Sequence, residues 1–360
     1  SITKPEGGKL WHFDHSLHST CGIKPLEGAV ATLRPGEGRF GGAVAVEEGT
    51  TNLFANPTLS NEAEQWVKSN STVKNYDGYV RITASDRYAG VHQTVGMQEG
   101  VTYTLSYWYR HVSGAAVVGS HIDGWDESNI QIRIDKGPWI IGNVIDVPDD
   151  SQFHFIEVRH TPTSSGSKKV YLQPGRLQLE ATTGDIRTGY GFGVQLEAKP
   201  FATSFVDGTR EHGQLLYQVS LADSGTIAFW VNVKKLRDDT GFQHILDLGT
   251  YGSAAGRAEF VFAGDNSGRF EFTVVDGTNT KHRIQTQLRT EFVNAWKFVV
   301  GTWNSGTAKL YIDGQPAGQV TYTDPRAFTH LYIGSYISNP VGTREQVPNA
   351  LIDELLILPY

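Results

Sequence analysis

Apolar and polar positions alternate along most of this chain, in short runs separated by turn residues. Near the C-terminus the runs 298–303, 309–312 and 350–357 each adjoin glycine, asparagine or aspartate. Runs of this length with such breaks are typical of antiparallel strands joined by tight turns. No segment of more than about three turns shows the periodicity of an amphipathic helix. The pattern therefore predicts an all-β protein.

The middle of the chain repeats the pattern at the spacing of a β-sandwich. Strands are expected at 79–84, 90–96, 101–110, 129–135, 152–160 and 169–172. Intervals of about ten to twenty residues between strands suit a sandwich. A chain of 360 residues is too long for one sandwich and suits two domains.

Motifs at both ends of the chain resemble one family. They are Leu10-Trp11-His12-Phe13-Asp14, Gly41-Gly42-Ala43-Val44, Thr302-Trp303-Asn304, Lys309-Leu310-Tyr311-Ile312-Asp313-Gly314 and Ile352-Asp353-Glu354. Together they resemble the laminin-G-like (concanavalin A-like) jelly roll. That family is mostly a glycan- and protein-binding scaffold, and some glycosidases also use it.

A second resemblance concerns two segments that lie between the N-terminal and C-terminal motifs of the first. The segments 47–57 and 191–205 resemble the two ends of carbohydrate-binding-module jelly rolls that are common in phage virion proteins. We therefore predict two antiparallel β-sandwich (jelly-roll) domains, one inserted into the other. Residues 1–49 and 208–360 would form the discontinuous sandwich, with 50–207 inserted at one of its loops. The alternative is a small N-terminal arm followed by two sequential domains.

Charge and cysteine content narrow the class of protein. The net charge of −7 argues against a nucleic-acid partner, and no apolar run approaches the roughly 20 residues that span a bilayer. The single cysteine, Cys21, excludes an intrachain disulfide. The first six residues hold no apolar segment of a signal peptide. These features agree with folding in a reducing cytoplasm.

The sequence favours a protein without enzymatic activity. A glycosidase needs two carboxylates on a shared face. The strands expected from the sequence contain no pair of acidic residues spaced two apart, as a shared strand face would require. Asp353 and Glu354 are adjacent, so on a regular strand they would point to opposite faces. Nucleophile-elbow, zinc-protease and phosphate-loop motifs are also missing.

Calcium is the metal that the family resemblance implies. Concanavalin A-like sandwiches often hold a structural Ca²⁺ between an aspartate of the final strand and oxygens of an early loop. Asp353 occupies the final-strand position and Asp14 the early one, and hard oxygen ligands suit Ca²⁺. The alternative is that Asp353 pairs with a nearby Arg or Lys. In the inserted module, Ser60 replaces the calcium-binding glutamate of the resembled modules, so calcium is not expected there.

Five residues of the inserted module are the predicted glycan contacts. Sugars are held by aromatic faces together with planar hydrogen-bonding side chains. In 102–110 the tyrosines fall on one face of a strand, and Trp108 and Arg110 fall on the other. Arg133 lies on the polar face of 129–135, and Trp125 and Trp139 stand in turns that could wall a cleft. The alternative is that these tryptophans seal the edges of the sandwich. The other tryptophans, at 11, 66, 230, 296 and 303, are expected to pack in the cores.

The resemblance implies a non-enzymatic virion protein of a bacteriophage, in the tail, adsorption apparatus or capsid decoration. It would be assembled in the host cytoplasm and would bind host-surface glycans and other virion proteins. Three alternatives stay open: a secreted, extracellular bacterial carbohydrate-binding protein, a depolymerase or glycosidase acting on the concanavalin A-like sheet, and a purely structural virion subunit. Homo-oligomerisation is also left open.

Overall fold

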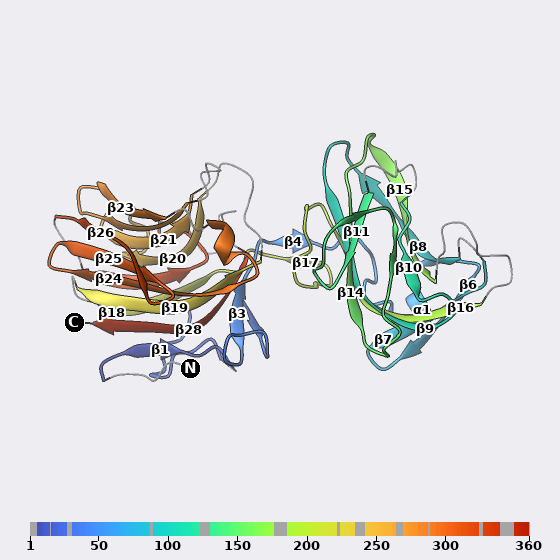
Figure 1. Ribbon diagram of the computed structural model, residues 1–360, viewed down its shortest axis with the longest axis horizontal. Coiled ribbons are helices and arrows are strands. Elements are labelled where there is room, and N and C mark those ends of the chain that lie inside the picture. Colours follow the sequence, from blue (N-terminus) through green and yellow to red (C-terminus); the bar gives the residue numbers. More distant parts are fainter. Residues whose placement is uncertain are drawn as a thin grey trace. The chain divides into compact units, whose positions relative to one another are not determined.

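The computed structural model describes residues 6–14, 16–26, 31–86, 89–122, 130–175, 186–221, 224–234, 242–263, 269–286, 289–323, 327–338 and 349–359. Antiparallel sheets dominate these residues, so the all-β, jelly-roll fold class is confirmed. The chain divides into two compact units (Figure 1). Unit 1 comprises 1–49 and 211–360, and unit 2 comprises 50–210. The second boundary follows residue 210, where the sequence predicted 207.

Unit 1 contains two antiparallel sheets. The first has the order β2 (Thr32–Arg34), β3 (Ala43–Val46), β28 (Ala350–Pro359), β19 (Gly225–Val233), β24 (Trp296–Asn304), β25 (Thr307–Ile312) and β26 (Gln315–Thr321), with β1 (Lys9–Trp11) also paired to β28. The second has the order β18 (Leu215–Leu221), β27 (Phe328–Ile333), β20 (Gln243–Gly249), β21 (Arg257–Phe262), β22 (Phe270–Val275) and β23 (Lys281–Thr286). A 3₁₀ turn, η2 (Arg289–Phe292), precedes β24.

The two sheets of unit 1 enclose one aromatic core. Phe229 and Trp303 come from the first sheet, and Phe260 and Phe272 from the second. A glycine at 301 is required between them, because a Cβ there would lie 2.4 Å from Cζ of Phe260. The alternating apolar positions of the sequence thus face inward from both sheets, as a sandwich requires.

Unit 2 is a second sandwich. Its larger sheet has the order β12 (Ile140–Ile141), β11 (Ile130–Ile134), β14 (His154–His160), β9 (Tyr103–Ser113), β16 (Arg187–Glu197), β7 (Tyr79–Ala84) and β6 (Ser71–Tyr76). The smaller sheet has the order β13 (Val144–Asp146), β10 (Val117–Gly119), β15 (Gly166–Pro174), β8 (Gly90–Met97) and β5 (Val67–Ser69). One helical turn, α1 (Ser60–Ala63), precedes β5. All six strands expected from the sequence overlap strands of this unit.

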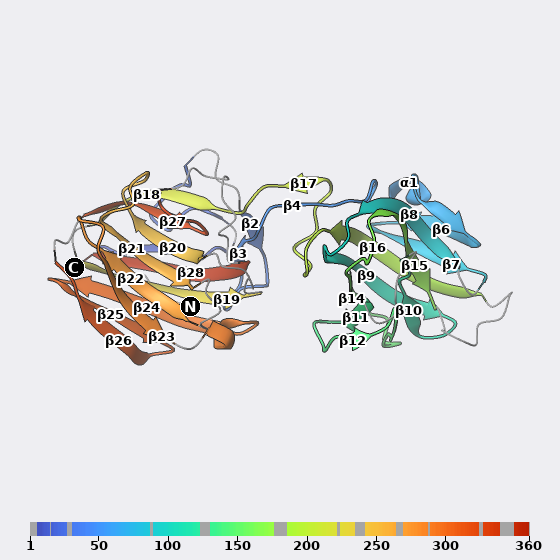
Figure 2. The ribbon, with the colours of Figure 1, turned by 90° about the horizontal axis from the view of Figure 1, so that it is seen from above.

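The two ends of unit 2 are joined by a short ladder. Strands β4 (Thr50–Thr51) and β17 (Thr209–Arg210) pair with each other as a separate two-stranded sheet of the described residues (Figure 2). In unit 1 the segments that flank this ladder are also bonded to each other: the amide of Gly213 donates to the carbonyl of Glu47 at 2.8 Å, and Gly49 N donates to His212 Nδ1 at 3.0 Å. The chain therefore leaves unit 1 and returns to it at neighbouring points.

Removing unit 2 should leave a folded unit 1. Residues 47–49 are hydrogen bonded to residues 212–213 within unit 1. A short linker from 49 to 211 therefore joins two chain ends that already lie close together. We expect the fusion of 1–49 with 211–360, and the separate fragment 50–210, each to be soluble, β-rich by circular dichroism and monodisperse. An insoluble fusion alongside a well-folded 50–360 fragment would instead favour sequential domains.

No helix among the described residues is both long and apolar enough to cross a membrane.

Candidate functional site

The larger sheet of unit 2 has one buried and one outward face, as strand alternation requires. On β9, Tyr107 and Tyr109 lie in the core, whereas Trp108 is 38% exposed on the opposite face, with Arg110 beside it. We call this outward surface the aromatic face. Its members are Tyr76, Tyr79, Trp108, Arg110, Phe153, Phe155, Tyr190 and Phe192.

Trp108 is the central ring of a row that crosses three strands. Phe155 on β14 and Phe192 on β16 are its direct cross-strand partners, with ring centroids 5.1 and 6.1 Å from that of Trp108. A bulge follows Phe192 in β16, where Gly193 has a φ of 62°. This left-handed conformation costs glycine little. The extra residue lets the strand continue with Gln195 on the same face as Phe192.

Arg110 is surrounded by the remaining rings of the aromatic face. Its guanidinium carbon lies 4.5 Å from the ring centroid of Tyr190, 4.9 Å from that of Phe153 and 5.6 Å from that of Tyr79. These are distances at which a cation is attracted to an aromatic ring. Phe153 in turn contacts Phe192, with centroids 4.9 Å apart. The rings around Arg110 are therefore continuous with the row around Trp108.

A buried carboxylate, Glu157 on β14, binds two cations beside the aromatic face. Arg133 Nε and Nη2 donate to its two oxygens at 2.8 and 3.0 Å, and Lys136 Nζ lies 3.0 Å from Oε2. Lys136 also stands over the ring of Phe155, 4.5 Å from its centroid. Glu157 thus fixes two cations, and one of them reaches the aromatic face.

Trp139 packs against two arginines. The guanidinium carbons of Arg133 and Arg159 lie 4.4 and 4.3 Å from its ring centroid. Burial lowers the pKa of Arg159, and the neighbouring positive charge of Arg133 lowers it further. The indole is half-buried, so Trp108 presents the more accessible ring.

The structure brings most of the predicted glycan contacts together. Trp108 and Arg110 share the aromatic face, and Arg133 and Trp139 touch each other and connect to that face through Lys136. Trp125 lies outside the described residues.

Sequence reasoning missed most of the rings around Trp108 and Arg110. Phe153, Phe155, Tyr79, Tyr190 and Phe192 were not selected. A usable signal was present for three of them: in 152–160 and 79–84 the aromatic residues alternate with valine and isoleucine, which places them opposite the core. The bulge at Gly193 had no comparable signal.

In unit 1 the two predicted calcium ligands flank one loop, 38–42. Asp353 Oδ2 accepts the amide of Phe40 at 3.1 Å, and Asp14 Oδ1 accepts the amide of Gly42 at 2.7 Å. Asp353 is fully buried, and burial raises its pKa to about 6. Its Oδ1 has no hydrogen-bond partner in the described part of the chain. A buried oxygen of this kind fits a bound cation.

The expectation that Asp353 and Glu354 point to opposite faces is wrong. In the pairing of β28 with β19, Trp230 faces Asp353 but Ala228 faces Leu356, so β28 carries one extra residue. Glu354 occupies this bulge with a φ of 50° and bonds His12 Nδ1 at 2.7 Å. Since Ile352 and Leu355 both remain in the core, the bulge places the two carboxylates on the same outward face.

Two of the tryptophans that were expected to pack in a core lie elsewhere. Trp303, Trp11 and Trp66 are buried in the sandwich cores. Trp230 and Trp296 are half-buried on the outward side of the first sheet of unit 1. They alternate with the core residues of β19 and β24, so the tryptophans in these runs could not all face inward.

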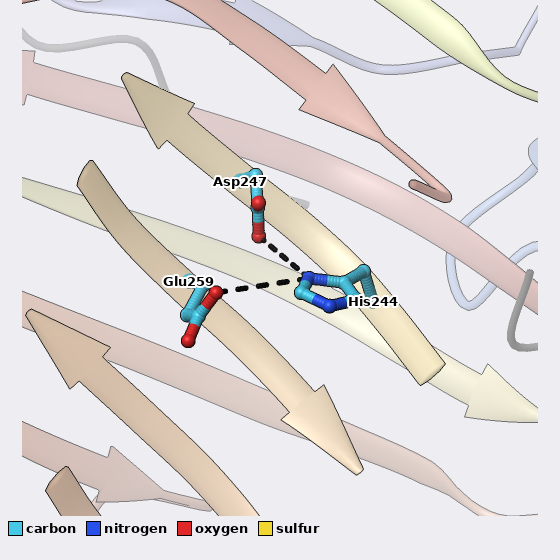
Figure 3. A group of neighbouring side chains, drawn as sticks. All are labelled: His244, Asp247 and Glu259. Atoms are coloured by element: carbon cyan, nitrogen blue, oxygen red, sulfur yellow. Dashed lines mark hydrogen bonds and ion pairs between the residues drawn. The ribbon is translucent and has the colours of Figure 1, made fainter. Parts of the chain in front are cut away.

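The outward side of the second sheet of unit 1 carries a buried polar cluster (Figure 3). His244 Nδ1 lies 3.0 Å from Asp247 Oδ1 and 3.9 Å from Glu259 Oε2. A bulge between His244 and Leu246 puts His244 and Asp247 on one face of β20. The three ligand atoms lie close enough to hold an ion.

Protein cations already balance this cluster. Arg257 Nε lies 3.0 Å from Glu259 Oε2, and Lys281 Nζ lies 3.8 Å from Oε1. Burial alone would favour a neutral imidazole, but the charge and hydrogen bond of Asp247, together with the charge of Glu259, outweigh it and raise the pKa of His244. Burial likewise raises the pKa of Asp247. The pair therefore keeps its proton to a higher pH than an isolated histidine would.

Comparison with known proteins supports the fold of the C-terminal part. Residues 207–360 match the family described as the concanavalin A-like lectin/glucanases superfamily, so that part of the predicted resemblance is confirmed. No curated protein matches the chain in sequence.

Similar solved structures include a heptameric SAP-like pentraxin from Limulus polyphemus. It shares 15% identity over 40% of this chain and 68% of that chain, with a TM-score of 0.32. The CBM40 of a Ruminococcus gnavus IT-sialidase bound to α2,3-sialyllactose shares 13% identity over 38% and 76%, with a TM-score of 0.31. A Bacillus licheniformis β-glucanase shares 14% identity over 44% and 76%, with a TM-score of 0.32.

Proposed function

We propose that this chain is a non-enzymatic glycan-binding protein and that unit 2 carries the main contact with the glycan. The observation that carries the proposal is the exposed indole of Trp108, held between Phe155 and Phe192 beside the ring-enclosed Arg110. An exposed aromatic surface with a few fixed polar groups is the usual construction of a sugar site. The match of residues 207–360 to a superfamily of lectins and glucanases agrees with a carbohydrate ligand.

On the aromatic face, aromatic rings and hydrogen-bond donors would contact different parts of a sugar. The Trp108 ring offers a flat surface for the C–H face of a pyranose, and its two phenylalanine neighbours restrict its rotation. Arg110 offers planar N–H donors to sugar oxygens. Because rings from neighbouring segments pack against both side chains, little ordering is needed when a ligand binds.

The proposal excludes glycosidase chemistry on this face. The described carboxylates among its cations are Glu157 and Glu197, and Asp135 and Asp150 at its edge are both bound to His154. Glu157 is held by Arg133 and Lys136, and Glu197 accepts hydrogen bonds from the amide and hydroxyl of Thr203 at 2.9 and 2.6 Å. A retaining or inverting enzyme needs one carboxyl group to donate a proton and a second to act as nucleophile or base. Buried carboxylates with fixed partners do not suit those roles.

A narrower proposal concerns biological context. The resemblance of 47–57 and 191–205 to modules of phage virion proteins favours a tail, adsorption or capsid-decoration protein that contacts other virion proteins and a host-surface glycan. On this proposal the protein is located in the virion. Competition of the purified chain with phage adsorption to host cells tests this context separately from glycan binding itself.

Direct binding tests the function. The full chain and the fragment 50–210 should retain the same polysaccharides on an array of bacterial capsule, cell-wall and storage glycans, and should release no reducing ends from them. Retention by unit 1 alone would move the site out of unit 2. Release of reducing ends would replace the proposal with an enzymatic one, and a chain that binds no glycan would be assigned to the structural-subunit alternative.

Asp353 and Asp14 are proposed ligands of a structural calcium ion in unit 1. If calcium occupies the site, adding it at about a hundredfold excess over Kd should stabilise unit 1 by about 2.7 kcal/mol, and chelator should lower the melting temperature. Asp353→Asn should abolish this response. Without an ion, the same substitution removes a buried charge and should raise the melting temperature in chelator and in calcium alike.

A further inference from the structure

We infer that the glycan recognised by the aromatic face is acidic and carries carboxylate groups, as a polyuronate does. This inference rests on the proposed function, because it names the class of ligand for the same site. It is drawn from the distribution of charge on that face, which differs from that of the whole chain.

Three cations lie along one line across the larger sheet of unit 2. Lys74 on β6 is directly opposite Arg81 on β7, Arg81 is opposite Tyr190 on β16, and Tyr190 is opposite Arg110 on β9. Like charges directly opposite one another on neighbouring strands are destabilising. The described residues supply no carboxylate partner to any of these three cations. Nε of Arg81 is buried and has no hydrogen-bond partner among them.

The excess of positive charge extends over the rest of the face. Its described cations are Lys74, Arg81, Arg110, Arg133, Lys136 and Arg159. The carboxylates facing them are Glu157 and Glu197, both buried and bonded. Nearby Asp135 and Asp150 are bound to His154 at the end of β14, and Asp77 lies in the turn between β6 and β7. A positive face on a chain of net charge −7 selects for an anionic partner.

The setting of Arg110 suits a carboxylate better than a hydroxyl. The rings of Tyr79, Phe153 and Tyr190 surround the guanidinium of the half-buried Arg110, and no hydrogen bond or ion pair joins that guanidinium to another described residue. A charge-assisted, two-pronged bond from arginine to carboxylate is shorter and stronger than a bond to a neutral oxygen. Partial removal from water strengthens it further. A neutral glycan could stack on Trp108 but would leave the line of cations uncompensated.

The inference is tested with matched pairs of polysaccharides. Polygalacturonate, alginate and hyaluronan are each compared with the same polymer after chemical reduction of its carboxyl groups, and binding to the full chain is measured by calorimetry. At least one acidic polymer should bind at least about tenfold more tightly than its reduced form. Raising the salt concentration from about 0.1 M to about 1 M should remove most of that difference, since the screening length falls from about 10 to about 3 Å.

Two kinds of variant separate charge from stacking. Arg110→Gln, and independently the exposed Lys74→Gln in case the first fails to fold, should bring the affinity for the acidic polymer down to that of its reduced form. Lys309→Gln, an exposed lysine of unit 1, is the matched control and should change nothing. Equal binding of acidic and reduced forms by the unmodified chain overturns the inference and leaves the glycan-binding function standing. Failure to bind any polysaccharide, acidic or neutral, rejects the proposed function as well.

Discussion

Replacing Trp108 with alanine is expected to weaken glycan binding about ten- to hundredfold. A stacked aromatic anchor typically contributes roughly 1–3 kcal/mol when it is truncated, and every 1.4 kcal/mol changes the affinity tenfold. The loss should be nearly uniform across acidic and neutral ligands, because stacking on C–H surfaces does not depend on ligand charge. The measurement is calorimetric titration of the variant with the polysaccharide that the unmodified chain binds best.

Stability decides how a loss of binding at Trp108 is interpreted. The side chain is 38% exposed, so its truncation should change the free energy of unfolding of unit 2 much less than truncation of a buried tryptophan, which typically costs 3–5 kcal/mol. Trp230→Ala is the matched control: it removes a half-buried tryptophan from an outward face of unit 1 and should leave binding unchanged. If Trp108→Ala unfolds unit 2, the residue is a structural plug and the contact lies elsewhere.

Replacing Asp247 with alanine is expected to destabilise unit 1 by about 3–5 kcal/mol, the usual cost of removing one partner of a buried ion pair. Without Asp247, the buried imidazole of His244 would lose its nearest carboxylate and the hydrogen bond that helps to hold its proton. The amide of Ile337, which donates to Asp247 Oδ2 at 3.0 Å, would also lose its acceptor. Hydrogen exchange at β20 and β21 in the full chain reports this change for unit 1 alone.

A surface pair and a pH series complete this test. Glu291→Gln removes the exposed carboxylate of an ion pair with Lys297, which keeps Asp313 as a closer partner, and should cost less than about 1 kcal/mol. Because the pKa of His244 is raised in the folded state, its contribution is complete below about pH 6.5 and is lost as pH rises through the folded-state value. The raised pKa of Asp247 acts in the same direction. Stability of unit 1 should therefore fall from neutral to alkaline pH, and His244→Gln should flatten that slope.

The alternation of apolar and polar residues was sufficient to predict which side chains of the regular strands face the core. Alternation in 102–110 separated Tyr107 and Tyr109 from Trp108 and Arg110, and the structure has the first pair in the core and the second pair outside. This inference succeeds because side chains on a regular strand alternate between two faces, and one face must be apolar to be buried. The same rule applied to 152–160 would have identified Phe153 and Phe155.

The sequence by itself therefore determined the fold class and which side chains share a face on the regular strands. Only the tertiary structure decided the exceptions at bulges. The bulge at Glu354 puts this residue on the same face as Asp353. The bulge after His244 puts His244 on the same face as Asp247. The bulge at Gly193 lets Gln195 follow Phe192 on one face of β16. A bulge is set by the strand opposite, which is distant in sequence, so no local pattern announces it. Strand order likewise decided that Trp108 lies between Phe155 and Phe192, because cross-strand neighbours are chosen by the packing of the whole sheet.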